Sequence, residues 1–195
     1  MAKAKPLIPF FVVLKDLSSW LQEANVPGII IGGIAASLLG RPRLTRDVDL
    51  VILIEEDNWE HFLASGSKFG FQPRLPNAIA FAKKARMLLV QHQLSAIDVD
   101  IALGSLPFED EAIARALWVD IGNVKIPIAT PEDLIIMKTL ARRARDIADI
   151  EALLDANLKL DLKRIRHWVG QFSTTLDMPQ LLTELNELIA KRRKK

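Results

Sequence analysis

The sequence contains no cysteine and few histidines. None of its 195 residues is a cysteine, so disulfide bonds and thiolate metal ligands are excluded. The three histidines stand at positions 61, 92 and 167, without the close spacing that a zinc site built from imidazole ligands needs. We therefore do not expect a zinc enzyme or a disulfide-stabilised scaffold.

The chain also lacks a long apolar run of the kind that spans a membrane. Its longest weakly polar stretch, 26–40, covers about fifteen residues, whereas a transmembrane helix requires roughly twenty. This stretch is interrupted by Pro27 and by four glycines. The basic start is followed by Lys15 and Asp16 rather than by a continuous secretory core. We therefore expect a soluble, cytoplasmic protein with no membrane partner.

Neither sign of charge dominates the sequence. Lys and Arg total 26 and Asp and Glu total 24, which is too balanced for a protein that wraps nucleic acid over its whole surface. Two local basic clusters occur, at 142–145 and 191–195, and we interpret the second as a solvated tail. Hydrophobic residues make up 50% of the chain, enough for a sizeable core in which the four tryptophans are expected to pack.

Apolar spacing indicates a mixture of helices and strands before residue 130. Helices are predicted over 7–23, 34–39, 57–69 and 109–117. Strands are predicted over 29–31, 47–54, 78–82, 86–92 and 96–103, and a hairpin over 118–129. Gly40 and Gly70 are expected to end two of the helices, Asp57 to cap one, and Gly122-Asn123 to form the hairpin turn.

The pattern changes after residue 129. The segment 130–133, Thr-Pro-Glu-Asp, is typical of a helix start, and the residues after it have helical periodicity with little strand signal. Further helices are predicted over 131–143, 145–155, 160–172 and 179–191. We therefore predict two domains, an α/β core over 1–129 and a helical region over 130–195. The predicted fold class is α+β, with a mixed sheet packed on helices and a C-terminal helical bundle.

Two aspartates separated by one residue begin the strand predicted over 47–54. Asp47 and Asp49 project from the same side of that strand, because side chains alternate along it, and an apolar run follows them. Paired carboxylates at the start of a buried strand are costly unless a cation lies between them, and oxygen ligands suit Mg²⁺ or Mn²⁺. Taken alone, the pair is equally compatible with a structural role.

A glycine pair lies between a predicted strand and a predicted helix. At Gly32 and Gly33 the absent Cβ atoms would let backbone N–H groups approach a phosphate, and a helix N-terminus adds a favourable field. A simple turn explains the pair equally well in isolation. Their spacing to Gly40 does not match the dinucleotide-binding fingerprint.

A second acidic pair lies on the strand predicted over 96–103. Asp98 and Asp100 also share one face of their strand, and one or both could supply the third carboxylate of a two-ion site. Three acidic side chains are the usual minimum when substrate phosphates complete the metal shell. The spacing does not choose between them, although the apolar run after Asp100 favours that residue slightly.

Together these motifs resemble the polymerase-β-like nucleotidyltransferase superfamily. The shared order is a strand, Gly-Gly, a helix, the motif Arg-x-Thr-x-Asp-x-Asp over 43–49, and a later strand with an aspartate between apolar residues. Residues 32–35 and 43–49 resemble the minimal bacterial nucleotidyltransferases that include abortive-infection type toxins of type IV toxin–antitoxin systems. The segments 131–138 and 145–149 are similar too, so the resemblance covers most of residues 26–155.

The resemblance implies a nucleotidyltransferase-type fold and a set of site residues. It implies that two metal ions, either Mg²⁺ or Mn²⁺, are bound at the catalytic site. Their ligands would be the catalytic residues Asp47 and Asp49 together with Asp100 or Asp98. Phosphate contacts are implied for the glycine pair and for Lys138. Where the superfamily often has Gly-Ser, this chain has Gly-Gly, so the backbone must replace a hydroxyl contact.

Other motif residues have two possible roles. Arg43, Thr45 and Arg46 either orient their loop or contact phosphate. Asp146 either belongs to the nucleotide site or caps a helix or pairs with an arginine, and a structural role is favoured for Asp149.

The activity implied is transfer of a nucleoside monophosphate from a nucleoside triphosphate to an acceptor hydroxyl. The acceptor is left open between transfer RNA or another RNA, a protein and a small molecule. The resemblance also suggests a toxin-like role with an antitoxin protein as partner. Two alternatives keep the same fold: a catalytically silent nucleotide-sensing or partner-binding module, and an antibiotic-modifying nucleotidyltransferase.

Overall fold

The computed structural model describes residues 8–122 and 124–192, which form two compact units. The first unit contains the chain up to Ile31 together with Thr45–Ile128. The second contains Gly32–Leu44 together with the chain from Ala129 onward, so the short segment 32–44 groups with the C-terminal helices. The predicted boundary between a domain over 1–129 and a domain over 130–195 stays a prediction.

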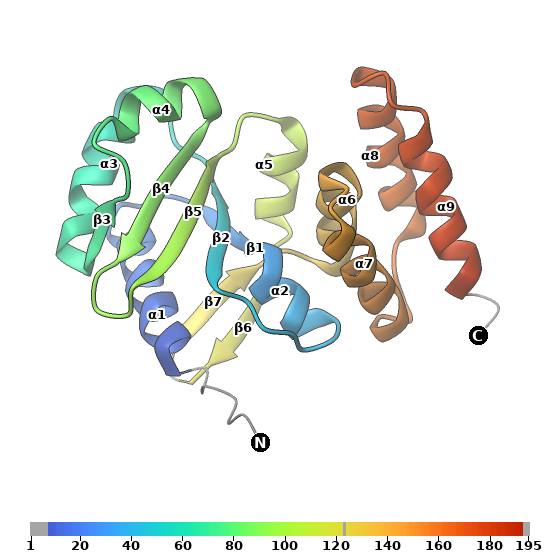
Figure 1. Cartoon of the computed structure of the whole chain (residues 1–195), viewed down its shortest axis with the longest axis horizontal. Helices are drawn as coiled ribbons and strands as arrows, with labels where there is room; N and C mark the ends of the chain where they lie inside the picture. Colours follow the sequence, from blue (N-terminus) through green and yellow to red (C-terminus); the bar gives the residue numbers. More distant parts are fainter. Residues whose placement is uncertain (1–7, 123, 193–195) are drawn as a thin grey trace. The chain divides into compact units, whose positions relative to one another are not determined.

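The first unit is built on a mixed sheet with the strand order β3-β4-β5-β2-β1-β7-β6 (Figure 1). The strands are β1 Gly28–Ile31, β2 Asp47–Ile52, β3 Phe71–Pro73, β4 Met87–His92, β5 Ile97–Leu103, β6 Leu117–Ile121 and β7 Val124–Ile128. β2 pairs in parallel with β5, and β1 pairs in parallel with β7. The remaining neighbours are antiparallel, so the sheet is mixed as predicted.

β5 and the first four residues of β2 bury every second side chain. Val48 and Leu50 of β2 and Val99 and Ile101 of β5 are 0% exposed. Side chains of a strand alternate between its two faces, so these four residues share the face that packs into the core. The positions between them on the same strands therefore belong to the opposite face, which is only half-buried.

The helices of the first unit pack an aromatic core against this sheet. They are α1 Ile8–Glu23, α3 Trp59–Ser65, α4 Ala78–Ala85 and α5 Pro107–Ala114, with the 3₁₀ helices η1 Glu56–Asn58 and η2 Gly66–Phe69. Trp20 of α1 stacks on Phe62 and Phe71, with ring centroids 4.3 and 5.1 Å away. Its indole N–H donates to the Ser65 hydroxyl at 2.9 Å, so its polar atom is satisfied inside the core.

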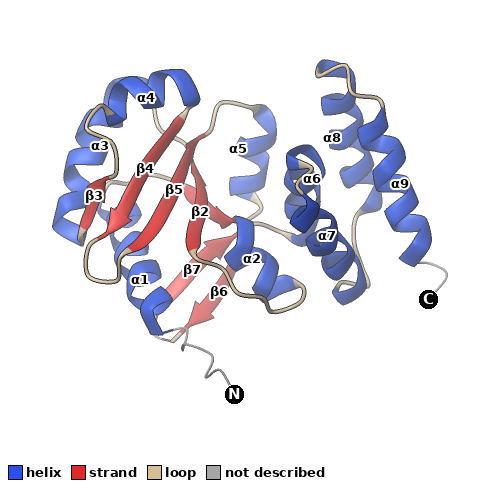
Figure 2. Cartoon of the chain, in the orientation of Figure 1, coloured by secondary structure: helices blue, strands red, loops and turns tan. Residues whose placement is uncertain are grey.

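The second unit contains helices alone among its described elements (Figure 2). They are α2 Gly32–Leu39, α6 Pro131–Ala141, α7 Ala144–Ala156, α8 Leu162–Thr175 and α9 Gln180–Arg192. Thr130 caps α6, because its hydroxyl accepts the Asp133 backbone N–H at 3.1 Å, which confirms the predicted helix start. In the described part of the chain, none of the helices is long and apolar enough to cross a membrane.

Most predicted elements are confirmed, but the strand predicted over 78–82 is wrong. These residues begin α4. Their apolar run has no period that distinguishes strand from helix, and alanine is the strongest helix former. Ala78 and Ala82 are buried one helical turn apart, so the helix presents them to the core on one side. The short strand β3, in turn, is not predicted.

Three smaller expectations are also wrong. Asp57 does not cap α3, because it lies inside η1 and Asn58 precedes the helix. The helix predicted over 109–117 ends at Ala114, and Leu117 begins β6. Trp118 is 66% exposed on β6, the edge strand of the sheet, rather than buried in the core.

Turn predictions at two glycines agree with the structure. Gly70 ends η2 in the left-handed conformation, with φ of 80°. Gly122 has φ of 63° between β6 and β7, a conformation that glycine adopts without strain. Its predicted partner in the turn, Asn123, and the first predicted helical residue, Leu7, lie outside the described residues.

Candidate active site

The four predicted aspartates lie on one face of the sheet. Asp47 of β2 is in register with Asp98 of β5, and Asp49 is in register with Asp100. Because paired residues of neighbouring strands point to the same side, all four carboxylates belong to the face opposite the buried Val48. We call these four residues the acid cluster. The parallel register thus unites two motifs that are about fifty residues apart in the chain.

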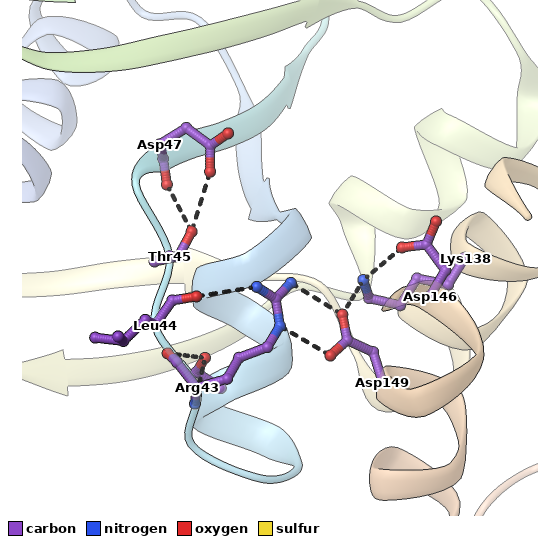
Figure 3. A network of polar contacts seen from close by, with 8 residues as sticks. Arg43, Leu44, Thr45, Asp47, Lys138, Asp146 and Asp149 are labelled. Carbon is purple, nitrogen blue, oxygen red and sulfur yellow. Dashed lines mark hydrogen bonds and ion pairs between the residues drawn. The ribbon is translucent and has the colours of Figure 1, made fainter. Parts of the chain in front are cut away.

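Thr45 holds the carboxylate of Asp47. Its hydroxyl donates to Asp47 Oδ1 at 3.0 Å and also lies 3.2 Å from the backbone oxygen of the same residue (Figure 3). Thr45 therefore positions a carboxylate, and its predicted role in orienting the loop or contacting phosphate stays a prediction. The neighbouring Arg46 is exposed.

Asp98 and Asp100 interact with side chains from the other side of β5. The Gln91 amide of β4 donates to Asp98 Oδ1 at 2.9 Å, and Gln91 is in register with Asp98. Arg74, directly after β3, donates through Nη1 to Asp98 Oδ2 at 3.0 Å and through Nη2 to Asp100 Oδ1. One guanidinium therefore spans both carboxylates of the β5 pair.

The donor chemistry of the acid cluster fits a hard divalent cation. Carboxylate oxygens are the preferred ligands of Mg²⁺ and Mn²⁺, and four of them come from two neighbouring strands. In residues 8–122 and 124–192, no three acidic or histidine side chains already converge in a metal-binding arrangement. Two of the four carboxylates are instead paired with Arg74, which supplies positive charge at this place.

The predicted glycine pair begins α2. Gly32 has φ of 62°, which favours glycine because a Cβ atom would strain this conformation. Gly33 is buried in the first turn of the helix. Gly32 follows Ile31 in the chain, and Ile31 is in register with Asp49. The pair thus occupies a helix start, as predicted, and its contact with phosphate stays a prediction.

Lys138 and Arg43 belong to a second set of charged residues, in the second unit. The Lys138 ammonium lies 3.1 Å from Asp146 Oδ1 and 2.6 Å from Asp149 Oδ2. Arg43 donates to Asp149 with its Nε at 2.9 Å and its Nη2 at 3.0 Å (Figure 3). We call these four residues the buried charge network. It joins α6, α7 and the segment before β2 with two cations and two carboxylates.

Three residues of the network are buried, the fourth, Arg43, is 28% exposed, and the charges are matched. Lys138 is 6% exposed, Asp146 is 4% exposed and Asp149 is 6% exposed. Burial acts to raise the pKa of Asp149, but hydrogen bonds and charges from Arg43 and Lys138 outweigh it and lower this pKa below its ordinary 3.8. The carboxylate of Asp149 is therefore kept ionised.

Of the two structural alternatives considered for Asp146, the helix cap occurs, whereas its ion pair is with a lysine and not with the predicted arginine. Its Oδ2 accepts the Arg143 backbone N–H at 3.0 Å, at the start of α7, and its Oδ1 pairs with Lys138. The structure accordingly gives Asp146 and Asp149 structural partners. Whether Lys138 and Asp146 also take part in nucleotide binding stays a prediction.

Arg74 and Gln91 are the residues of this site that sequence reasoning missed. Gln91 could have been found, because it is a polar residue in the strand predicted over 86–92 and alternates with buried neighbours. Arg74 follows a three-residue strand that ends in a proline, so no periodic pattern draws attention to it. Only the sheet order β3-β4-β5 brings it to the acid cluster.

The fold and the site define a class of protein. A mixed seven-stranded sheet, aspartate pairs on two neighbouring parallel strands and the C-terminal helices α6–α9 together form a nucleotidyltransferase fold. The chain belongs to the family described as "Nucleotidyl transferase of unknown function (DUF2204)", whose model matches residues 11–187. No curated protein sequence matches the chain.

Solved structures with the same fold include enzymes that act on antibiotics. An antigenic nucleotidyltransferase-like protein from Paracoccidioides brasiliensis is 18% identical, with a TM-score of 0.57 over 88% of this chain and 90% of that one. The antibiotic-resistance factor ANT(2'')-Ia is 17% identical, with a TM-score of 0.58 over 88% and 95%. The lincosamide antibiotic adenylyltransferase LnuA is 13% identical, with a TM-score of 0.54 over 78% and 98%. At these identities the likeness establishes the fold.

Proposed function

We propose that this protein is a divalent-metal-dependent nucleotidyltransferase that moves a nucleoside monophosphate from a nucleoside triphosphate to an acceptor hydroxyl. The observation that carries the proposal is the parallel register of β2 and β5, which unites Asp47 with Asp98 and Asp49 with Asp100 on one face. Membership of a nucleotidyl transferase family supports the same reaction class.

The acid cluster would hold the metal, with each strand supplying part of the coordination. Asp47 and Asp49 come from β2, and Asp100 or Asp98 comes from β5. When bound, Mg²⁺ or Mn²⁺ supplies charge for the triphosphate and makes an acceptor hydroxyl easier to deprotonate. Thr45 keeps Asp47 oriented through its hydroxyl, so this carboxylate is positioned before any ligand arrives.

The reaction requires no covalent intermediate with the protein. The acceptor oxygen bonds to the α-phosphorus and gives its proton to water, and the bond from that phosphorus to the bridging oxygen breaks, so that pyrophosphate leaves with the electron pair. The rate then depends on positioning and on electrostatic stabilisation by the groups that surround the phosphates. The backbone at Gly32 and Gly33 is proposed to contact phosphate, as the start of a helix does elsewhere.

The surroundings of Lys138 bear on its predicted contact with the triphosphate. Its Nζ is within hydrogen-bond distance of Asp146 and Asp149, and the side chain is buried. Two of its three N–H donors are therefore used, and burial of the side chain restricts the approach of a phosphate to the third. We therefore base the proposal on the acid cluster and not on this lysine.

The deciding experiment uses α-labelled nucleoside triphosphates, Mg²⁺ and a panel of acceptors. The panel contains transfer RNA, other RNA, proteins and small hydroxyl compounds. We expect labelled product with one class of acceptor, and its loss in Asp49→Ala. Asp120→Ala is the matched control, because Asp120 is an exposed aspartate on the edge strand β6 of the same sheet.

Two results would contradict the proposal. One is the absence of transfer by the wild-type protein with every triphosphate and acceptor class. The other is transfer that Asp49→Ala leaves undiminished. Metal-dependent nucleotide binding by calorimetry without any transfer would instead match the non-catalytic alternative.

A small-molecule acceptor is the second candidate that a specific observation favours. ANT(2'')-Ia and LnuA share the fold, and the matched region covers 95% and 98% of those chains. One solved structure of the former contains adenylyl-2"-tobramycin. Aminoglycosides and lincosamides therefore belong in the acceptor panel. The toxin-like role, the antitoxin partner and the cytoplasmic location stay predictions.

A further inference from the structure

We propose that Arg74 is a resident cation of the acid cluster, which holds Asp98 and Asp100 in the metal-free protein and competes with a divalent ion for them. The proposal rests on the proposed function, in which these carboxylates help to bind the metal. It adds a residue that controls how readily the metal enters.

The position of Arg74 follows from the sheet. Its backbone N–H donates to the Leu89 carbonyl oxygen at 2.9 Å, which continues the pairing of β3 with β4 by one residue. Leu89 is in turn in register with Asp100 on β5. Arg74 therefore enters the same cross-strand row as Asp100 and Asp49. Its location is fixed by backbone pairing, and only the side chain needs to move.

The guanidinium uses oxygen atoms that a metal would need. Nη1 binds Asp98 Oδ2 and Nη2 binds Asp100 Oδ1, so one planar cation bridges two carboxylates that are two residues apart on one strand. Two such carboxylates repel each other without a cation between them. A divalent ion supplies twice the charge at the same place, so it and Arg74 are alternatives.

One atom of Arg74 is unsatisfied in this arrangement. Its Nε is buried and has no hydrogen-bond partner among the described residues. A buried donor without a partner weakens the arrangement that contains it. The side chain is 26% exposed, so it can leave the carboxylates towards water without disturbing the core. Once released, its donors suit phosphate oxygens, which accept from the guanidinium fork.

The test measures Mn²⁺ binding by the full-length protein without nucleotide, from the electron paramagnetic resonance signal of the free ion. We expect Arg74→Gln to bind Mn²⁺ about tenfold more tightly than the wild type, because the competing charge is gone. Lys83→Gln is the matched control, since Lys83 is an exposed cation of α4 that pairs with Glu56 at 3.3 Å, and its affinity should equal that of the wild type. Adding Asp49→Ala to Arg74→Gln should abolish the gain.

Equal or weaker Mn²⁺ binding by Arg74→Gln would overturn the proposal, as would an equal gain in Lys83→Gln. If circular dichroism shows that Arg74→Gln does not fold, Arg74→Met replaces it with an uncharged side chain of similar length. The transfer assay separates this proposal from the proposed function. Transfer by the wild type together with unchanged Mn²⁺ affinity in Arg74→Gln refutes only the role of Arg74. Tighter Mn²⁺ binding without transfer refutes only the enzyme.

Discussion

Aspartates gather at two places in this protein, the acid cluster of the first unit and the buried charge network of the second. In the network, Asp146 and Asp149 are almost fully buried and are paired with Lys138 and Arg43. In the acid cluster the side chain of Asp98 is 40% exposed and that of Asp100 is 29% exposed.

The partners of the carboxylates differ as much as their burial does. Within the described residues, Asp47 is held by the Thr45 hydroxyl and not by a cation. The network instead matches two carboxylates with two cations, as buried charges require. Buried carboxylates that are each paired with a cation hold the helices of the second unit together. Half-buried carboxylates on a sheet, by contrast, can accept a further cation.

The largest expected effect separates activity from stability in the acid cluster. Asp49→Ala should lower nucleotidyl transfer about a thousandfold, because in the proposed site it removes a carboxylate that would hold the metal, and the metal would stabilise the negative charge of the transition state. Its free energy of unfolding, measured with urea, should change by less than about 1 kcal/mol, since the side chain is half-buried and outside the core. A large loss of stability in Asp49→Ala would mean that the acid cluster, like the buried charge network, stabilises the fold.

The opposite result is expected in the buried charge network. Lys138→Met should lower the free energy of unfolding by about 3 to 5 kcal/mol, because it leaves two buried carboxylates without their shared cation. Urea denaturation measures this loss, and Lys159→Met is the control, since Lys159 is exposed in the same unit. An unchanged denaturation midpoint in Lys138→Met would show that the network does not stabilise the helices.

A smaller effect is expected at the residue that orients Asp47. Thr45→Val keeps the shape of the side chain but removes the hydroxyl that donates to Asp47 Oδ1. Transfer activity should fall about tenfold, as it does when a group that supports a metal ligand is lost. Steady-state kinetics with Thr45→Ser, which restores the hydroxyl, should recover most of the activity. No recovery by serine would mean that the methyl group of Thr45 is what matters.

The smallest effect is a pH dependence that belongs to the network. The pKa of Asp149 is lowered in the folded protein, so its contribution to stability is complete above its unfolded pKa of 3.8. That contribution is lost as the pH falls through the lower, folded value. Urea unfolding between about pH 6 and pH 3 should show this loss in the wild type and less of it in Asp149→Asn. If the stability of the wild type and of Asp149→Asn depended on pH in the same way, Asp149 would not be the source of the loss.

The elements that carry strong periodic patterns could be predicted from the sequence. β5 alternates buried and half-buried residues throughout, and β2 does so from Asp47 to Leu50. Both strands, and the shared face of each aspartate pair, therefore follow from the sequence alone. The helices after Thr130 follow from capping and spacing in the same way. The parallel pairing of β2 with β5, by contrast, is not predicted, because no local signal chooses a partner strand.

The remaining features depend on contacts between distant parts of the chain. The segment 78–82 is apolar throughout, and packing of Ala78 and Ala82 decides that it is a helix. Arg74 directly follows β3, and it reaches Asp98 and Asp100 of β5 because only β4 lies between these two strands in the sheet. The resemblance predicts a phosphate contact for Lys138, whereas the carboxylates that it binds here come from α7, which its own sequence context does not reveal.

The parallel register of β2 and β5 also determines when the site can form. Its two halves are separated by about fifty residues, and a parallel pair forms slowly because a long loop must close first. β4 and β5 are neighbours in the chain and can pair early as a hairpin, but β2 must wait for them. During synthesis, the aspartate pair of β2 therefore stays apart from the pair of β5 until the chain has left the ribosome as far as Leu103 and β2 has paired with β5.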